Sequence, residues 1–386
     1  MRRNTGNIAL VCGGAAVILA AIAILLSLPD RDCTELTIGT YGENIYLYSF
    51  DNKTLEFTLK SKAEVRNGSY ALSCRDEKGH IGTFAVSETG KESGIVSFDK
   101  AVISGLRQTA DKLQTGADPC FIMLYDDNKY LFTADYSGGS ISIFPISEGV
   151  IGERLEKMDF EGSGPIKGRQ ESSHIHQIRQ IPAIENFGND WLLASDLGSD
   201  VLRLIYVSHI RSTMNGESIM PVHIQDFPCP PGSGPRHMEF SSDGRILYCM
   251  AELSGEVLVY EISNKDGQPE LQLKQRIQAD EVNAGGSADI HIHPSGKWLY
   301  TSHRLDNDGL AIFSIKDDGE LEKIGYAKTA RHPRNFMITE DGNLLLVACR
   351  DDGLVQVFRI NDDGGLKLTP SILRFDSDRP SSVTSY

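Results

Sequence analysis

Histidine and arginine recur in three short segments, each placed just before an apolar stretch. The segments are Ser172-Ser173-His174-Ile175-His176, Gly234-Pro235-Arg236-His237 and His332-Pro333-Arg334-Asn335-Phe336. An imidazole titrates near neutral pH and can take a proton from water. A guanidinium can hold a carboxylate, a phosphate or an oxyanion by paired hydrogen bonds. These residue types therefore favour hydrolysis or binding of an anionic ligand.

A second series consists of charged residues that end apolar segments at corresponding places. Its members are Asp135, Asp196, Glu252, Arg304 and Arg350, and Glu88 and Tyr41 fit the same place in two further segments. For any single member, a solvated strand end is the alternative interpretation. The set is harder to explain in that way, because charges next to buried strands need partners or water. Equivalent ends of a radial repeat would bring these charges into a ring.

Other catalytic patterns are missing from the sequence. His174 and His176 could share one face of a strand and bind a metal, but no third ligand is evident, so no metal or cofactor is predicted. No G-x-S-x-G segment and no phosphate-binding glycine loop occurs. His291 and His293 alternate along a strand and are interpreted as structural. The seven cysteines include no C-x-x-C pair, which favours free, buried thiols.

The elements that position these residues are short strands in a repeating pattern. An apolar strand, a turn and an alternating strand recur seven times, and Leu247, Leu299 and Leu345 mark a spacing of 52 and 46 residues. A period near 50 built of strands predicts an all-β, seven-bladed propeller with four-stranded antiparallel blades. We expect this domain at residues 34–376, with one blade closed by both chain ends through Leu36–Tyr41 and Lys367–Phe375, and a flexible tail at 377–386. A two-sheet sandwich is the alternative fold.

Residues 1–30 form a separate segment. Arg2 and Arg3 precede Ile8–Leu28, a stretch of 21 residues without a charge. Its length predicts a transmembrane signal anchor, with the propeller on the non-cytoplasmic side of the cell envelope. A cleaved signal peptide and an incorrectly assigned start codon are the alternatives. The net charge of −15, with no basic cluster, argues against nucleic acid as a partner, so membrane contact is expected only through this segment.

The chain from Thr37 to about Phe375 resembles the seven-bladed propeller lactonase family, which includes propeller-type 6-phosphogluconolactonases and carboxy-cis,cis-muconate cyclases. The resemblance rests on the three histidine and arginine segments above, on Gly162-Ser163-Gly164-Pro165 with Arg169-Gln170, on Ser195 to Asp200, and on Glu252-Leu253. It implies an active site made of His176, Arg236, Glu252 and Arg304. Two positions depart from the family pattern: Asp135 stands where Asn is usual, and His303 precedes Arg304 in place of Asn.

These residues suggest a metal-independent hydrolysis of a sugar lactone. His176 would activate water, Glu252 would orient His176 or move a proton, and Arg236 and Arg304 would bind the substrate anion and the oxyanion. Further substrate-binding residues are expected at His174, His237, Arg334, Arg350, Asp196 and Gln170.

The predicted substrate is a small anionic or sugar lactone. An exported domain would not meet 6-phosphogluconolactone, which is made in the cytosol, so an unphosphorylated lactone or another anionic ligand is preferred. Two other functions are the alternatives: an exported, non-catalytic propeller that binds a carbohydrate or a protein, and a muconate-type cycloisomerase that would use the same site.

Overall fold

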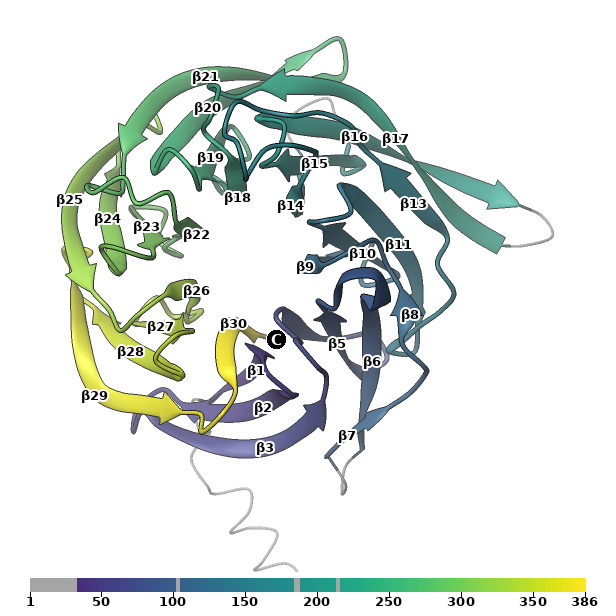
Figure 1. Cartoon of the computed structure of the whole chain (residues 1–386), viewed down its shortest axis with the longest axis horizontal. Coiled ribbons are helices and arrows are strands. Elements are labelled where there is room, and N and C mark those ends of the chain that lie inside the picture. Colours follow the sequence, from purple (N-terminus) through teal and green to yellow (C-terminus); the bar gives the residue numbers. More distant parts are fainter. Residues whose placement is uncertain (1–32, 102–104, 184–187, 213–215) are drawn as a thin grey trace, which may run out of the picture.

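A computed structural model describes residues 33–101, 105–183, 188–212 and 216–386. In these ranges the strands form seven antiparallel sheets arranged radially about one axis (Figure 1). The predicted seven-bladed propeller is thus confirmed. The predicted membrane segment, Ile8–Leu28, lies outside the described residues. Within the described ranges, no helix is long and apolar enough to cross a bilayer.

Five blades contain four strands each. The strands of each blade are given from the axis to the rim. Two of these blades consist of β14 (Ile175–Gln180), β15 (Trp191–Asp196), β16 (Val201–Ser212) and β17 (Gly216–Pro228), and of β18 (Pro235–Phe240), β19 (Ile246–Ala251), β20 (Glu256–Lys265) and β21 (Gln268–Gln278). The next two consist of β22 (Ser287–Ile292), β23 (Trp298–His303), β24 (Gly309–Ile315) and β25 (Leu321–Lys328), and of β26 (Pro333–Ile338), β27 (Leu344–Cys349), β28 (Leu354–Ile360) and β29 (Leu366–Arg374). The fifth combines both ends of the chain and consists of β30 (Arg379–Ser385), β1 (Cys33–Tyr41), β2 (Asn44–Asp51) and β3 (Glu56–Glu64).

Two blades carry a fifth, short strand at the rim. They are β4 (Ala71–Arg75), β5 (Ile81–Ser87), β6 (Gly94–Ala101) and β7 (Gly105–Gln108), with β8 (Leu113–Gln114) also on β6; and β9 (Pro119–Tyr125), β10 (Tyr130–Asp135), β11 (Ser140–Ser147) and β12 (Val150–Ile151), with β13 (Glu156–Asp159) also on β11. A 3₁₀ turn, η1 (Gly90–Glu92), connects β5 to β6.

The ring is closed by strands from both chain ends, as expected, but the closing strand is not the one predicted. Residues 367–375 belong mainly to β29, the rim strand of its own blade, whereas β30 pairs with β1. The structure therefore differs from the predicted flexible tail at 377–386. The sequence of this stretch does not look like a strand because it is rich in polar residues. In the folded protein their hydroxyls have partners: Ser381 donates to the Ser69 carbonyl (2.7 Å) and Thr384 to the Ala71 carbonyl (2.9 Å).

The apolar core lies between neighbouring blades. In one such layer, Leu193 and Leu204 from one blade pack with Leu247, Cys249 and Leu258 from the next. Burial on both sheet faces explains why the second strand of several blades, such as β19 and β27, is a nearly continuous apolar segment. The rigid stack fixes the inner strands, whose ends surround the axis (Figure 1).

Candidate active site

A repeated β-bulge aims one residue from each of several inner strands at the axis. In β14 the pairing with β15 moves from Ile175 to Gln177 and leaves His176 unpaired. In β18 and β26 the corresponding unpaired residues are Arg236 and Arg334, and in β9 the residue is Cys120. A bulge changes the direction of a side chain and is common beside active sites. The same backbone device therefore delivers the thiol, the imidazole and both guanidiniums to one end of the channel.

Glu252 is the counter-ion of three arginines at this end of the channel. Its Oε2 accepts from Arg236 Nε (2.8 Å) and lies 3.2 Å from Arg304 Nη2, and its Oε1 accepts from Arg169 Nη2 (2.6 Å). Burial alone would raise the pKa of Glu252, but Arg304, Arg236 and Arg169 outweigh it and lower the pKa to about 2. The carboxylate is therefore ionised and is a poor proton acceptor. The expected role of Glu252 in orienting His176 has no supporting contact in the structure.

Arg236 and Arg304 are bound on several sides by the protein itself. Arg236 Nη1 donates to the Ala288 carbonyl (2.6 Å), and Arg304 Nε donates to the Gly286 carbonyl (2.8 Å). Both side chains are almost fully buried. The structure brings them together with Glu252, as expected for a converging site. However, neither arginine is among the residues that line the cavity described next.

A cavity of about 270 Å³ opens beside this cluster. It is lined by Tyr41, Glu88, Asp118, Cys120, Tyr136, Ser137, Arg169, His176, Glu252 and Arg334. The lining includes His176 and Glu252. It also includes Glu88, whose carboxylate accepts from the Tyr41 hydroxyl (2.8 Å) and from Ser69. Burial raises the pKa of Glu88. The cavity thus offers both acceptors and donors to a small polar ligand.

Arg334 lines the cavity and differs from the other arginines of the site in its lack of an ion-pair partner among the described residues. Its guanidinium lies 5.2 Å from the centre of the Tyr41 ring, and it makes no hydrogen bond or ion pair with any residue that the structure describes. Burial alone would lower its pKa, but Tyr41, Glu88 and Glu252 raise it. This arginine is therefore charged and available to a ligand, unlike Arg236 and Arg304.

His176 lines the cavity in its neutral form. Burial, and then the charge of Arg236, hold its pKa well below the ordinary value. Its Nδ1 lies 3.8 Å from the Cys120 thiol, and the edge of its ring meets Tyr136 at a centroid distance of 5.6 Å. His174, expected on the same strand face, instead precedes β14. It stacks on Tyr136 at 4.4 Å, and its Nδ1 lies 2.9 Å from the Tyr136 carbonyl, so it positions that ring.

The remaining expected substrate-binding residues lie outside the cavity lining. Asp196 is fully buried and pairs with Arg203 (2.6 Å), which holds the turn after β15 together. Gln170 donates to the Leu197 carbonyl (2.8 Å) and supports the loop that carries Arg169. Arg350 pairs with Asp351 (2.8 Å). The structure thus gives these side chains structural partners.

Several lining residues were not identified from the sequence as binding candidates. Arg169 was visible only as part of a motif beside Gln170, and Glu88 and Tyr41 only as members of the strand-end series. Cys120 and Asp118 belong to no motif of the sequence. Their common signal is position, since each lies at an axial strand end or in the adjoining loop.

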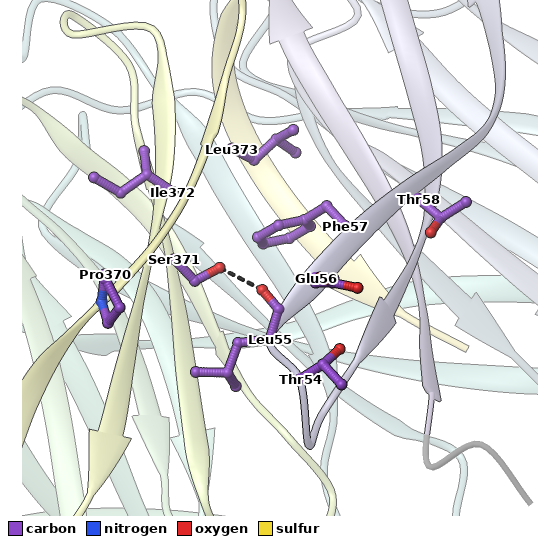
Figure 2. A pocket seen from close by; sticks show the side chains of 9 residues that line it. All are labelled: Thr54, Leu55, Glu56, Phe57, Thr58, Pro370, Ser371, Ile372 and Leu373. Carbon is purple, nitrogen blue, oxygen red and sulfur yellow. Dashed lines mark hydrogen bonds between the residues drawn. The ribbon is translucent and has the colours of Figure 1, made fainter.

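A larger groove of the described chain lies at the rim, away from these groups. It has a volume of about 630 Å³ and lies between β3 and β29, lined by residues 54–58 and 370–373. Figure 2 shows the Ser371 hydroxyl donating to the Leu55 carbonyl across it. Glu56 is its single ionisable lining residue, so it offers no acid–base pair. Among the described residues, no group of three or more His, Cys, Asp or Glu side chains could hold a metal ion.

Comparison with known proteins agrees with this geometry. The model of the family described as "Lactonase, 7-bladed beta-propeller" matches residues 35–384. A 6-phosphogluconolactonase of Formosa agariphila is 32% identical, over 89% of this chain and 96% of the relative. A crystal structure from Bacteroides fragilis, provisionally named a 6-phosphogluconolactonase, has a TM-score of 0.82 and 36% identity, over 93% of this chain and 99% of that one. The periplasmic gluconolactonase of Pseudomonas aeruginosa has a TM-score of 0.75 and 26% identity, over 92% and 99%.

The chain therefore belongs to the seven-bladed β-propeller lactonase family. It is a lactone-hydrolysing enzyme of that family.

Proposed function

We propose that the protein hydrolyses an unphosphorylated sugar lactone in the cell envelope. The observation that carries this proposal is the charge balance of the cavity. Among its lining groups, Glu252 and Arg169 are paired with each other, which leaves Glu88 and Asp118 as carboxylates without an arginine partner and Arg334 as the one guanidinium without an ion-pair partner among the described residues. A dianionic phosphate would meet this single guanidinium and two carboxylates, whereas the hydroxyls of a neutral lactone can donate to carboxylates.

In this proposal Arg334 contacts the lactone carbonyl. Because it has no partner among the described residues, it can donate to the oxygen that becomes negative when water adds to the carbonyl carbon. A preorganised donor in a buried site stabilises that charge. Glu88 and Asp118 accept hydrogen bonds from the sugar hydroxyls, and His176 contacts the sugar ring.

Location in the envelope is supported by the uncharged stretch Ile8–Leu28. It is also supported by the likeness to the periplasmic gluconolactonase of Pseudomonas aeruginosa. A reporter that is active only in the cytoplasm, fused after Tyr386, should stay inactive. Strong reporter activity would remove this part of the proposal and restore a phosphorylated lactone as substrate.

Turnover of a lactone panel tests the reaction. Purified protein should open glucono-δ-lactone with a higher kcat/KM than 6-phosphogluconolactone, and a chelator should not change the rate. A preference for the phosphorylated lactone would refute the argument from cavity charge. Turnover of a carboxymuconate alone would indicate a cycloisomerase, and saturable binding of a sugar without turnover would indicate a binding protein.

A further inference from the structure

A water-sized recess shares lining residues with the cavity. Its volume is about 10 Å³, close to the minimum that holds one water molecule. Cys120 and Arg334 line both this recess and the cavity. The rest of its wall is polar as well and consists of Arg236, His237, Asn335, Ser69, Ser381 and Tyr70. The recess therefore adjoins the place where a lactone would bind.

His237 presents an unsatisfied nitrogen in this buried place. Its Nδ1 lies 2.6 Å from Asp289 Oδ1, while its Nε2 is buried and has no hydrogen-bond partner among the described residues. A buried polar atom without a partner is rare in proteins, and its usual partner in such cases is ordered water. The His176 and His237 rings are adjacent, with centroids 5.1 Å apart.

Asp289 determines which nitrogen of His237 carries the proton. Its Oδ1 also accepts from the Ile290 amide (3.0 Å), and its Oδ2 accepts from the Asn335 amide group (2.5 Å) and the Phe336 amide (3.1 Å). His291 Nε2 lies 3.1 Å from the same oxygen. Burial alone would raise the pKa of Asp289, but His291 and His237 hold it well below its usual range. An ionised Asp289 requires a donor at His237 Nδ1, which leaves Nε2 as an acceptor.

His176 lacks such support. Its Nδ1 lies 3.8 Å from the Cys120 sulfur, and no carboxylate of the described residues forms an ion pair with His176. A thiol cannot stabilise a positive imidazolium as a carboxylate can. An imidazole that removes a proton from water needs a second group to orient it and to stabilise the charge that forms.

We infer that His237, held by Asp289, binds the hydrolytic water in this recess and is the general base of the reaction, in place of His176. The inference rests on the proposed lactone hydrolysis. One water O–H donates to His237 Nε2, and the oxygen faces the carbonyl carbon of the lactone above it. His237 is then a catalytic residue, and Asp289 is a positioning residue that acts through it.

The step is balanced without any further reactant. The water proton moves to His237 Nε2 as the water oxygen bonds to the carbonyl carbon, and the carbonyl oxygen becomes an oxyanion that faces Arg334. When the intermediate collapses, the bond between the carbonyl carbon and the ring oxygen breaks. The proton then passes from His237 to the ring oxygen, and the hydroxy acid product loses its carboxyl proton to solvent.

The surroundings keep His237 unprotonated. Burial, and then the charge of Arg236, lower its pKa to about 4, although Asp289 opposes this. His291, whose pKa Asp289 raises to about 10 despite burial, neutralises part of the Asp289 charge. The neutral base is thus present throughout the physiological range, and kcat/KM should fall only as the pH approaches about 4.

Asparagine substitutions of the two histidines test this assignment on the full-length protein with the best lactone of the panel. His237→Asn keeps an amide donor near Asp289 but removes Nε2, so kcat should fall by roughly 10²- to 10⁴-fold with KM changed less than threefold. His176→Asn should change KM more than kcat. His80→Asn is the control, because His80 also pairs with an aspartate, Asp76 (2.8 Å), on the exposed turn between β4 and β5; it should leave both constants unchanged.

Asp289→Asn adds a readout that a structural role would not give. An asparagine can donate to Nδ1 and so favour the tautomer with the proton on Nε2, which cannot accept from water. The kcat should fall as in His237→Asn while KM changes less than threefold, a split between kcat and KM that a general loss of structure would not give. A kcat of His237→Asn within threefold of the unsubstituted protein would overturn the inference. A kcat loss in His176→Asn that equals or exceeds the loss in His237→Asn would overturn it as well.

A crystal structure of the unsubstituted protein provides a test that does not depend on the folding of variants. A water should lie within 3.2 Å of His237 Nε2; an empty recess would overturn the inference. If the unsubstituted protein opens no lactone, the proposed function fails, and a water found in the recess would then show a buried water site without a catalytic role.

Discussion

Removal of the Glu252 charge should destabilise the fold strongly, because this one carboxylate faces three guanidiniums. In Glu252→Gln the side chain keeps its size but leaves Arg236 and Arg304 buried without a counter-charge. Breaking a buried ion pair typically costs about 3–5 kcal/mol. The pKa gives a second estimate: a change from 4.5 to about 2, at about 1.4 kcal/mol per pH unit, corresponds to roughly 3 kcal/mol. Both routes predict a loss of about 3–5 kcal/mol in the free energy of unfolding.

The pH dependence of this loss has a defined sign. The pKa of Glu252 is lower in the folded protein than in the unfolded chain, so its contribution is fully present above about pH 4.5 and is lost as the pH falls towards about 2. Urea unfolding of both proteins should therefore show a stability difference that is large at pH 7 and shrinks below pH 4.5. Glu256→Gln in the same blade is the control, because Glu256 pairs with the half-exposed Arg276 (2.9 Å) and should cost less than about 1 kcal/mol. Equal effects of the two variants at pH 7 would refute the reasoning.

Three further outcomes are expected. Arg334→Met should reduce kcat on glucono-δ-lactone by a factor that corresponds to roughly 1.5–3 kcal/mol, the value of a charged hydrogen bond. The control Arg350→Met should leave kcat unchanged in the same steady-state assay, and equal losses in the two variants would contradict the role of Arg334. Deletion of residues 378–386 should expose the edge of β1 and cause aggregation measurable by light scattering, and a truncated monomer with the parent melting temperature would contradict closure by β30. Gly198→Ala should lower the stability of the fold by about 1–3 kcal/mol, because the added Cβ would lie 1.8 Å from the Ser172 carbonyl oxygen. Thermal unfolding measures this loss. Gly188→Ala is the control, because its Cβ would lie 3.8 Å from Asp190 Oδ2.

The propeller could be predicted from the sequence because its signal is repeated. Seven similar units each supply an apolar second strand, and tight turns separate them. The closing strand was missed because Arg379–Ser385 is rich in short polar residues. Such a strand becomes recognisable only when its partners are known, since the Gly39, Ser69 and Ala71 carbonyls that accept from its hydroxyls lie more than 300 positions away.

The site could be predicted in its members but not in its internal pairing. Sequence reasoning identified His176, Arg236, Glu252 and Arg304 as a converging group, and the structure places all four at one end of the channel. It could not show that Glu252 neutralises both arginines, because that depends on distances between blades. For the same reason it could not separate Arg334, which has no such partner among the described residues, from the paired arginines.

The bulges suggest how one scaffold can present different sites. Cys120, His176, Arg236 and Arg334 occupy one structural position in four blades, each the unpaired residue where an inner strand begins. Because the backbone aims this position at the axis regardless of its side chain, a substitution there changes the chemistry of the cavity without moving a strand. In the blade of β22 the shifted stretch contains Ala288 and Asp289. The Ala288 carbonyl accepts from Arg236, and the Asp289 carboxylate pairs with His237. This bulge therefore positions both Arg236, which pairs with Glu252, and His237, which lines the recess.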